Sequence, residues 1–218
     1  MRIILSVFLL LTLYSNGMAQ DTSIVYFNNN WKKTKPGKSI LIQKTIQYKD
    51  FSKVEYFDST MKLMTSGYYR DNYMDSIWIV FNPQNNNYDT LNYGGIKELF
   101  LNTEDNFLWD EIFIMVENMP GFGEKGEYGT EAFREYIAQN IHYPIRAQQN
   151  HKEGKVFIRF IVGKDGKVYG LKSIKEADTD LIFEALRVIH SSPLWKPGRQ
   201  RNEAVAVMLT FPVAYALQ

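Results

Sequence analysis

The chain contains no cysteine in its 218 residues. This absence excludes disulfide bonds, thiol nucleophiles, cysteine-ligated metals and lipid anchors attached to a cysteine. An excess of one charge sign is also lacking, because 25 basic and 24 acidic residues leave a formal net charge of +1. Nucleic acid is therefore not an expected partner. The 45% hydrophobic and 15% aromatic content favours one or two domains with real cores.

Long hydrophobic runs are absent as well. The almost unbroken apolar run from Ile3 to Tyr14 has 12 residues, fewer than the roughly 20 that a membrane-spanning helix needs. Arg2 precedes the run and Gly17-Met18-Ala19 follows it, a pattern typical of a secretory signal peptide. We expect residues 1–19 to be removed, leaving a mature protein in the periplasm that begins at Gln20. The alternative is an uncleaved segment that anchors the protein to the inner membrane.

Residues with catalytic or metal-binding chemistry are few and scattered. Three histidines show no metal-ligand spacing and are interpreted as surface residues rather than ligands: His142, His151 and His190. Ser191 and Ser192 follow His190 directly, an arrangement in which side chains rarely face each other, and no G-x-S-x-G motif is present.

Three acidic residues cluster at the start of a predicted helix, namely Asp178, Asp180 and Glu184. Capping and compensation of the helix dipole explain acidic residues at such a place. We therefore expect no enzymatic activity, no cofactor and no bound metal.

Residues 20–118 are predicted to form a mainly antiparallel β domain. Short stretches rich in aromatic and β-branched residues alternate at period two, and turn-formers such as Arg70-Asp71-Asn72 separate them. Residues 111–116 are interpreted as the closing strand. The succession of Tyr56-Phe57, Ser66-Gly67-Tyr68 and Trp78 resembles the hairpin repeats of MORN-type or YwqK-like proteins. That resemblance implies a spacer or docking surface and transfers no catalytic residue.

A proline and two glycines between residues 118 and 124 predict a linker at 119–128 and a second domain at 129–218. A helix capped by Thr130 is followed by a strand opened by Gly154, a hairpin turn at residues 163–166 and a return strand with a bulge near Gly170. Asp178 or Thr179 caps a second helix with one apolar face. The predicted fold is α+β, with two helices packed on a three-stranded antiparallel sheet.

The last predicted strand, residues 204–213, contains Pro212. It places residues 205, 207, 209, 211 and 213 toward the core, and Ala206, Met208 and Thr210 outward. Proline cannot donate to a β ladder, so the strand is expected at a sheet edge, where unpaired N–H and C=O groups are offered to another chain. We predict that an extended partner segment pairs there.

Several features of this domain occur in the order found in one known family. They are Tyr143-Pro144 with Ala147 three residues later, Gly154 opening a strand, Asp165-Gly166 in a turn, and Trp195-Lys196-Pro197-Gly198 before the last strand. The chain from about Gly121 to Leu217 thus resembles the C-terminal domain of TonB, the periplasmic energy transducer that touches outer-membrane transporters. The resemblance implies that an extended transporter peptide, the TonB box, pairs alongside the last strand in TonB-dependent transmembrane transport.

The resemblance also implies that residues around Tyr143-Pro144 contact the transporter, here Asn140, Ile141, His142, Tyr143 and Pro144. The basic pair Arg199 and Arg201 is interpreted either as a solvated turn or as charges that steer an acidic segment. A full TonB has a membrane helix with a Ser/His pattern and a Pro-rich spacer, whereas this chain has neither, which leaves coupling to a proton-driven motor without support. The main alternative is a periplasmic structural protein whose domain pairs with itself or with a scaffold.

Overall fold

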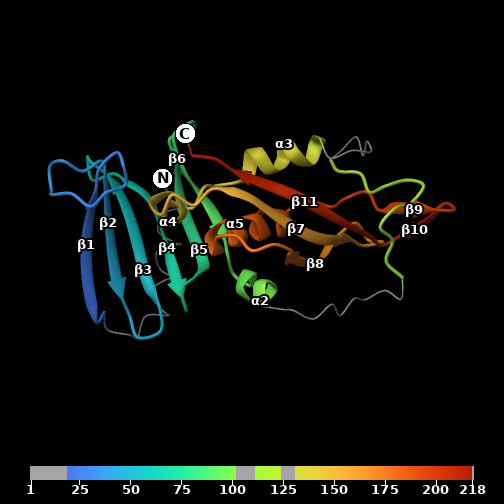
Figure 1. Ribbon diagram of the computed structural model, residues 1–218, viewed down its shortest axis with the longest axis horizontal. Coiled ribbons are helices and arrows are strands. Elements are labelled where there is room, and N and C mark those ends of the chain that lie inside the picture. The colour runs from blue at the N-terminus through green and yellow to red at the C-terminus, as the bar shows by residue number, and fades with distance from the viewer. Residues whose placement is uncertain (1–18, 102–110, 124–130, 218) are drawn as a thin grey trace, which may run out of the picture. The chain divides into compact units, whose positions relative to one another are not determined.

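The computed structural model describes residues 19–101, 111–123 and 131–217 (Figure 1). The predicted signal peptide falls outside these ranges except for its last residue, and so do the predicted helix cap Thr130 and the second half of the predicted linker. The chain divides into two compact units, residues 1–91 and 92–218.

The first unit is a six-stranded sheet in the order β1-β2-β3-β4-β5-β6 (Figure 1). Its strands are β1 (Asp21–Phe27), β2 (Leu41–Gln47), β3 (Ser52–Asp58), β4 (Leu63–Arg70), β5 (Tyr73–Asn82) and β6 (Asn87–Asn92). Strands β1 to β5 pair antiparallel with their neighbours. Between β4 and β5, Asp71 and Asn72 both have positive φ angles, 48° and 69°, the geometry of a tight two-residue hairpin. The predicted antiparallel β region is confirmed.

The core of this sheet lies on the face that carries Val54, Tyr56 and Met74, all of which are buried. The indole of Trp78 lies directly over Gly67, because a Cβ atom at position 67 would approach Trp78 Cδ2 to 2.0 Å. Glycine at position 67 therefore provides the space that the largest side chain of this core needs.

The second unit is built on a three-stranded antiparallel sheet of order β11-β7-β8. Its elements are α2 (Ile96–Leu101), α3 (Glu131–Asn140), α4 (Ile145–Gln149), β7 (Gly154–Val162), β8 (Val168–Ser173), α5 (Thr179–His190) and β11 (Val207–Tyr215). On the inner face of the sheet, Phe133 of α3 lies 4.7 Å from the ring of Phe211, and α5 packs against β7 and β8. The predicted α+β architecture is confirmed.

Local predictions for this unit also hold. The Asp178 carboxylate caps α5 by accepting a hydrogen bond from the Asp180 N–H at 3.0 Å. The pairing of β7 with β8 shifts register between Arg159 and Ile161, and Gly170 opposite has a φ of 55°, so the bulge is where it was predicted.

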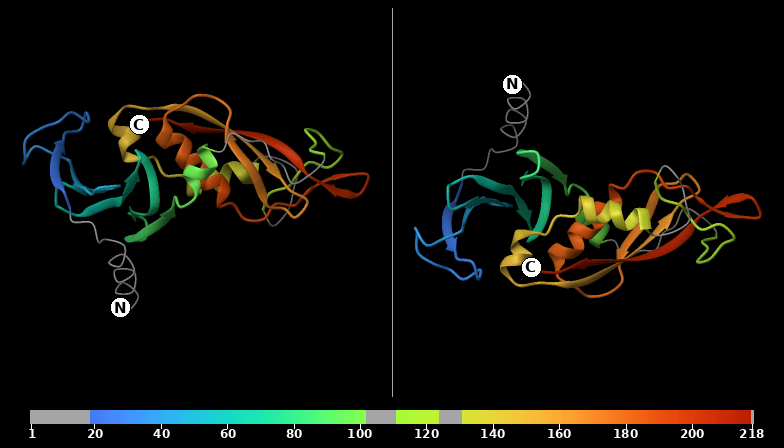
Figure 2. Two further views of the ribbon diagram at one scale, coloured as in Figure 1. Left: turned by 90° about the horizontal axis from the view of Figure 1, so that it is seen from below. Right: turned by 90° about the horizontal axis from the view of Figure 1, so that it is seen from above.

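The last predicted strand, in contrast, is interrupted. β9 (Gly198–Gln200) and β10 (Glu203–Val205) form a hairpin of their own around Arg201 and Asn202, whose φ angles are 50° and 63° (Figure 2). β11 starts only at Val207, and Ala206 between the two strands is completely buried. The prediction that Ala206 points outward is therefore wrong, because the strand breaks at this residue.

Residues 111–123 belong to the second unit and do not close the sheet of the first. Isolated bridges join Phe113 to Val207, Asn118 to Arg199, and Gly121 to Lys196. Phe122, inside the predicted linker, packs against aromatic rings, 4.9 Å from that of Phe133 and 4.8 Å from that of Trp195. The segment supplies apolar side chains to the second core, so the two units divide after Leu91 and not at residues 119–128.

Candidate functional site

β11 lies at one edge of its sheet, because it pairs with β7 on one side and has no strand on the other among the residues described. The direction of its backbone groups follows from a bridge to the segment before α3. Phe113 donates its N–H to Ala206 O at 2.9 Å and accepts the N–H of Met208 at 2.8 Å. Residues 206 and 208 thus present their backbone groups away from β7. Since this orientation alternates along an antiparallel strand, residues 210, 212 and 214 do the same.

Pro212 fits this alternation. Its position is one at which the backbone N–H would point away from β7, so the missing donor removes no hydrogen bond from the β7–β11 ladder. Pro212 is nevertheless paired in register with Phe157, and the strand continues to Tyr215. The sequence prediction of an edge strand therefore agrees with the observed order of strands.

The edge is not open along its whole length. Phe113 already covers it at Ala206 and Met208, two of the residues predicted to receive a partner. The open stretch that remains runs from Thr210 to Ala214. Thr210 and Ala214 are exposed and Pro212 is half-buried, whereas Phe211 and Val213 between them are buried under the helices. We refer to residues 210–214 as the free edge.

The predicted contact segment, residues 140–144, passes the other end of β11. The ring of Tyr143 lies 5.4 Å from that of Tyr215, and its hydroxyl donates to Lys152 O at 2.5 Å. Pro144 is buried, and the other four residues of the segment are half-buried. The structure thus brings residues 140–144 and the end of β11 together, although about seventy residues of sequence separate them.

A completely buried carboxylate on α5 holds this segment in place. Glu184 accepts the His142 N–H at 2.7 Å and the Tyr93 hydroxyl at 2.5 Å. Arg187 donates to both oxygens of Glu184, at 2.7 and 2.6 Å, and also to the carbonyl of Asn140 at 2.8 Å. The Glu184–Arg187 pair therefore holds this segment by hydrogen bonds to the His142 N–H and the Asn140 carbonyl.

The protonation states in this network follow from its burial. Burial raises the pKa of the Tyr93 hydroxyl well above its ordinary value, and the charge of Glu184 acts in the same direction. Burial alone would lower the pKa of Arg187, but the hydrogen bonds and charge of Glu184 outweigh that effect and raise it. Tyr93 is consequently a hydrogen-bond donor, and Arg187 stays charged.

A second buried acid, Asp180, also forms an ion pair with an arginine. Arg146 of α4 donates to the two oxygens of Asp180, at 2.6 and 2.5 Å. Burial raises the pKa of the Asp180 carboxyl, and the guanidinium of Arg146 opposes that shift. Asp178 caps α5 and Asp180 lies in its first turn, as capping and dipole compensation predict, whereas the same interpretation of Glu184 is wrong because Glu184 lies beyond the first turn.

The sequence held one signal for this network. Glu184 is the sixth residue of α5, beyond the first turn in which dipole compensation operates, and it lies three residues before Arg187 in the otherwise apolar stretch from Leu181 to Ile189. Charges at that spacing on a buried helix indicate an internal ion pair, whereas the partners Tyr93 and His142 lie too far away in the sequence to be found from it.

The predicted steering residues lie at the opposite end of β11 from Tyr143. Arg199 and Arg201 belong to the β9–β10 hairpin, and both are exposed. The Arg199 side chain donates to Asn202 O at 2.9 Å, and the Arg201 N–H donates to the carboxylate of Glu117 at 3.1 Å. The predicted site residues thus line the two ends and the edge of one strand.

Comparison with known proteins bears on the same stretch of chain. The family model for the C-terminal region of the Gram-negative bacterial TonB protein matches residues 139–217. Residues 139–217 are thus similar to a TonB C-terminal domain. The solution structure of the TonB C-terminal domain of Helicobacter pylori is 29% identical, with 39% of this chain and 77% of that chain covered and a TM-score of 0.31. No match was found among curated proteins.

The matched residues include α4, β7, β8, α5 and β11, and they contain all the sequence-predicted contact residues from Asn140 to Pro212. Proteins of the TonB family are non-catalytic energy transducers of the cell envelope, and their C-terminal domains interact with outer-membrane transporters. The resemblance of the N-terminal sheet to MORN-type repeats stays a prediction.

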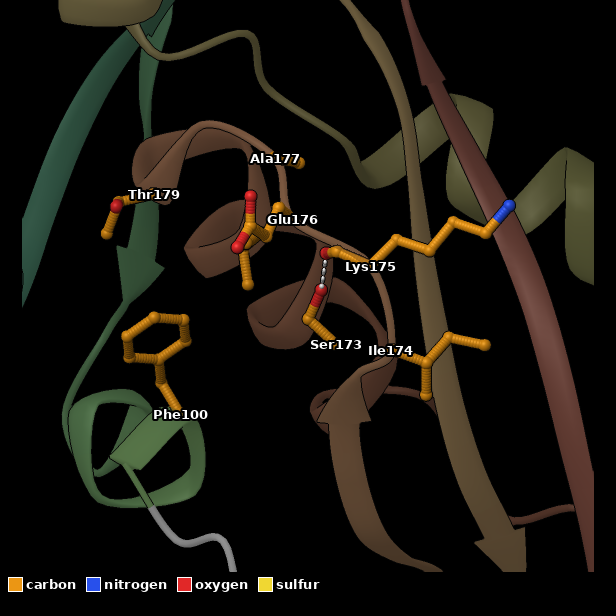
Figure 3. A pocket seen from close by; sticks show the side chains of 8 residues that line it. Phe100, Ser173, Ile174, Lys175, Glu176, Ala177 and Thr179 are labelled. Carbon is orange, nitrogen blue, oxygen red and sulfur yellow. Dashed lines mark hydrogen bonds between the residues drawn. The ribbon is translucent and has the colours of Figure 1, made fainter.

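A hollow of about 480 Å³ beside the start of α5 contains none of the predicted contact residues (Figure 3). Phe100 of α2 and the connection from Ser173 to Ala177 line it. The Ser173 hydroxyl donates to Lys175 O at 2.9 Å within that connection, while the Lys175 ammonium lies 4.4 Å from the centre of the Phe157 ring.

No group of three or more metal-ligating side chains lies close together within ranges 19–101, 111–123 and 131–217. In the same part of the chain, no helix has the length and apolar character to cross a membrane.

Proposed function

We propose that this protein uses its TonB C-terminal domain to bind an extended segment of an outer-membrane transporter, or of another envelope protein, by adding a strand to β11. The observation that carries the proposal is the free edge, residues 210–214, where a sheet edge with exposed backbone is present in a domain of the TonB family. In strand addition the backbone bonds supply affinity and the neighbouring side chains supply selectivity.

The free edge defines the register of such a strand. Thr210 and Ala214 each offer an N–H and a C=O, and Pro212 offers a C=O only. A partner would pair with these groups and end near Phe113, which occupies the edge at Met208. The Tyr143 segment, anchored by Glu184, would meet the other end of the same partner.

The proposal includes the location of the protein. The secretory pattern of residues 1–19 supports export to the periplasm, where TonB C-terminal domains interact with outer-membrane transporters. Tyr143 and the free edge then bind a partner and catalyse no reaction. We therefore propose that the protein has no enzymatic activity.

Replacing Thr210 with Pro tests the mechanism, because it removes the N–H that faces the partner and leaves the bonds to β7 intact. Thr210→Val is the matched control, since it keeps the N–H in a β-branched residue. Residues 20–218 of each variant are immobilised and exposed to a solubilised outer-membrane fraction. We expect the parent and T210V to retain a transporter that T210P does not.

Two outcomes would contradict the proposal. If T210P remains folded and retains the same transporter, strand addition at this edge is refuted. If no variant retains a transporter but the parent sediments as a dimer that T210P abolishes, the domain pairs with itself, and the structural alternative replaces the proposal.

A further inference from the structure

Two neighbouring apolar side chains, Ile114 and Met115, lie in water on the segment that covers the start of β11. They are 77% and 83% exposed, more than any other large apolar side chain in the described part of the chain. Scattered single apolar residues are ordinary on protein surfaces, whereas adjoining ones leave a continuous apolar surface that a partner can cover. We call these two residues the apolar pair.

The bend that carries the apolar pair is held at both ends, beside the β9–β10 hairpin (Figure 2). Phe113 before it forms two backbone hydrogen bonds to the edge, at 2.9 and 2.8 Å, and Val116 after it is buried with Val207. The Glu117 N–H then donates to Gln200 Oε1 at 3.0 Å. The apolar pair is therefore presented on a fixed piece of backbone, so little entropy is lost in ordering it when a partner binds.

The same bend borders the free edge. Phe113 pairs with Val207 in a parallel bridge, so the chain reaches this bridge running in the direction of β11, toward Thr210. Phe113 O accepts the Met208 N–H, the last contact before the free edge begins. The apolar pair directly follows this contact in the chain, so it lies at the Thr210 end of the free edge.

We infer that the partner strand continues past Thr210 and places a large apolar side chain, such as Leu, Ile, Phe or Met, on the apolar pair. This inference rests on the proposed function and names the chemistry of the partner just outside the paired stretch. Backbone bonds at the free edge accept many sequences, whereas covering the apolar pair requires an apolar residue at one fixed distance from them. The apolar pair thus selects among extended segments.

Two other occupants fit the surroundings less well. Glu111 and Glu117 flank the apolar pair, and Arg199 and Arg201 lie on the neighbouring hairpin, all of them exposed. This mixed charge differs from the basic surround of a segment that inserts into anionic lipid. Two side chains alone also offer far less area than the roughly 1,000 Å² of a specific dimer interface. A segment already held by strand addition needs only this small additional area.

Selected peptides and serine variants of the apolar pair test this contact. A display library of random peptides of about twelve residues, long enough for a typical strand and its flanks, is selected on residues 20–218. Peptides that fail to bind Thr210→Pro should share a large apolar residue at a fixed spacing from the paired stretch. The best of them, and its analogue with Ser at that position, are titrated calorimetrically against the parent, Ile114→Ser and Met115→Ser. All three proteins should unfold at the same urea concentration, because the replaced side chains are exposed.

Each serine variant should bind the peptide about three- to tenfold more weakly than the parent, because part of an apolar side chain is no longer buried. The Ser analogue should bind all three proteins alike. The heat-capacity change of binding should be less negative for the serine variants, since less apolar surface is covered. Met115→Leu, which keeps an apolar side chain, should retain the affinity. Met61→Ser is the matched control, because Met61 is 62% exposed on the β3–β4 connection, and it should change nothing.

Three kinds of result would overturn the inference. If peptides depend on Thr210 but bind both serine variants like the parent, the contact is refuted and strand addition stands. If no selected peptide is sensitive to Thr210→Pro, the inference falls together with the proposed function. If the serine variants lose sedimentation with vesicles of phosphatidylethanolamine and phosphatidylglycerol, or lose dimerisation, at unchanged peptide affinity, the apolar pair serves a lipid surface or a second copy of the chain instead.

Discussion

Replacing Glu184 with Gln should strongly destabilise the second unit while changing almost no volume. The carboxylate receives four hydrogen bonds, from Tyr93, from the His142 backbone and twice from Arg187, and it is completely inaccessible to solvent. Glutamine keeps one acceptor oxygen but turns an NH₂ group toward a donor. Arg187 cannot lose its proton, so its charge is left buried without a counter-charge.

The expected cost is about 3–5 kcal/mol, the range found when one partner of a buried ion pair is removed. Replacing both partners, as in Glu184→Gln with Arg187→Met, should cost less than Glu184→Gln alone, because the buried charge is gone. The loop at residues 140–142 should open at lower free energy than the rest of the unit, since it loses the bonds from Glu184 directly.

Hydrogen exchange measured at increasing urea concentration separates these effects in residues 20–218. Peptides from α5 report the stability of the second unit, peptides from residues 140–142 report the loop, and peptides from β3 and β4 are an internal reference that should not change. A loss below about 1 kcal/mol in α5, or a double variant less stable than the single one, would refute the role of the buried pair.

Two further predictions concern the first unit. Gly67→Ala should cost about 1–3 kcal/mol, because its Cβ would meet Trp78 at 2.0 Å, and urea unfolding followed by exchange in β4 measures it; an unchanged stability would disprove the contact. Burial opposes ionisation of Glu55, but hydrogen bonds and charges from Lys53 and Lys44 outweigh it and lower the pKa of this carboxyl below 4.5. The stabilising effect is present above pH 4.5 and lost as the pH falls through the lowered pKa, so Glu55→Gln should flatten the acid limb of unfolding below pH 4.5, and an unaltered limb would contradict this.

Much of the fold could be read from local patterns, because those patterns act over short distances. The Asp71-Asn72 turn, the Asp178 cap and the bulge near Gly170 each depend on a few neighbouring residues, and all three are present. Pro212 indicated an edge strand for the same reason, since a missing N–H is a property of a single residue.

Other features depended on which segments meet. Residues 111–116 have the composition of a strand, but whether they extend the first sheet or cover the edge of β11 depends on which apolar surface remains to be filled. The last strand looked continuous because its alternation is continuous, but Ala206 separates β10 from β11, and β10 pairs with β9 across the turn at Arg201 and Asn202.

The edge of β11 shows most clearly which features follow from the sequence and which from the tertiary structure. The sequence alone determined that a strand with Pro212 lies at an edge and that the TonB-like pattern surrounds it. Only the tertiary structure decided that Phe113 covers its first part, that Glu184 supports the Tyr143 segment, and that Ile114 and Met115 border the free edge. The physical reason is that pairing across strands and burial of charge join residues that are distant in the chain, so no local pattern records them.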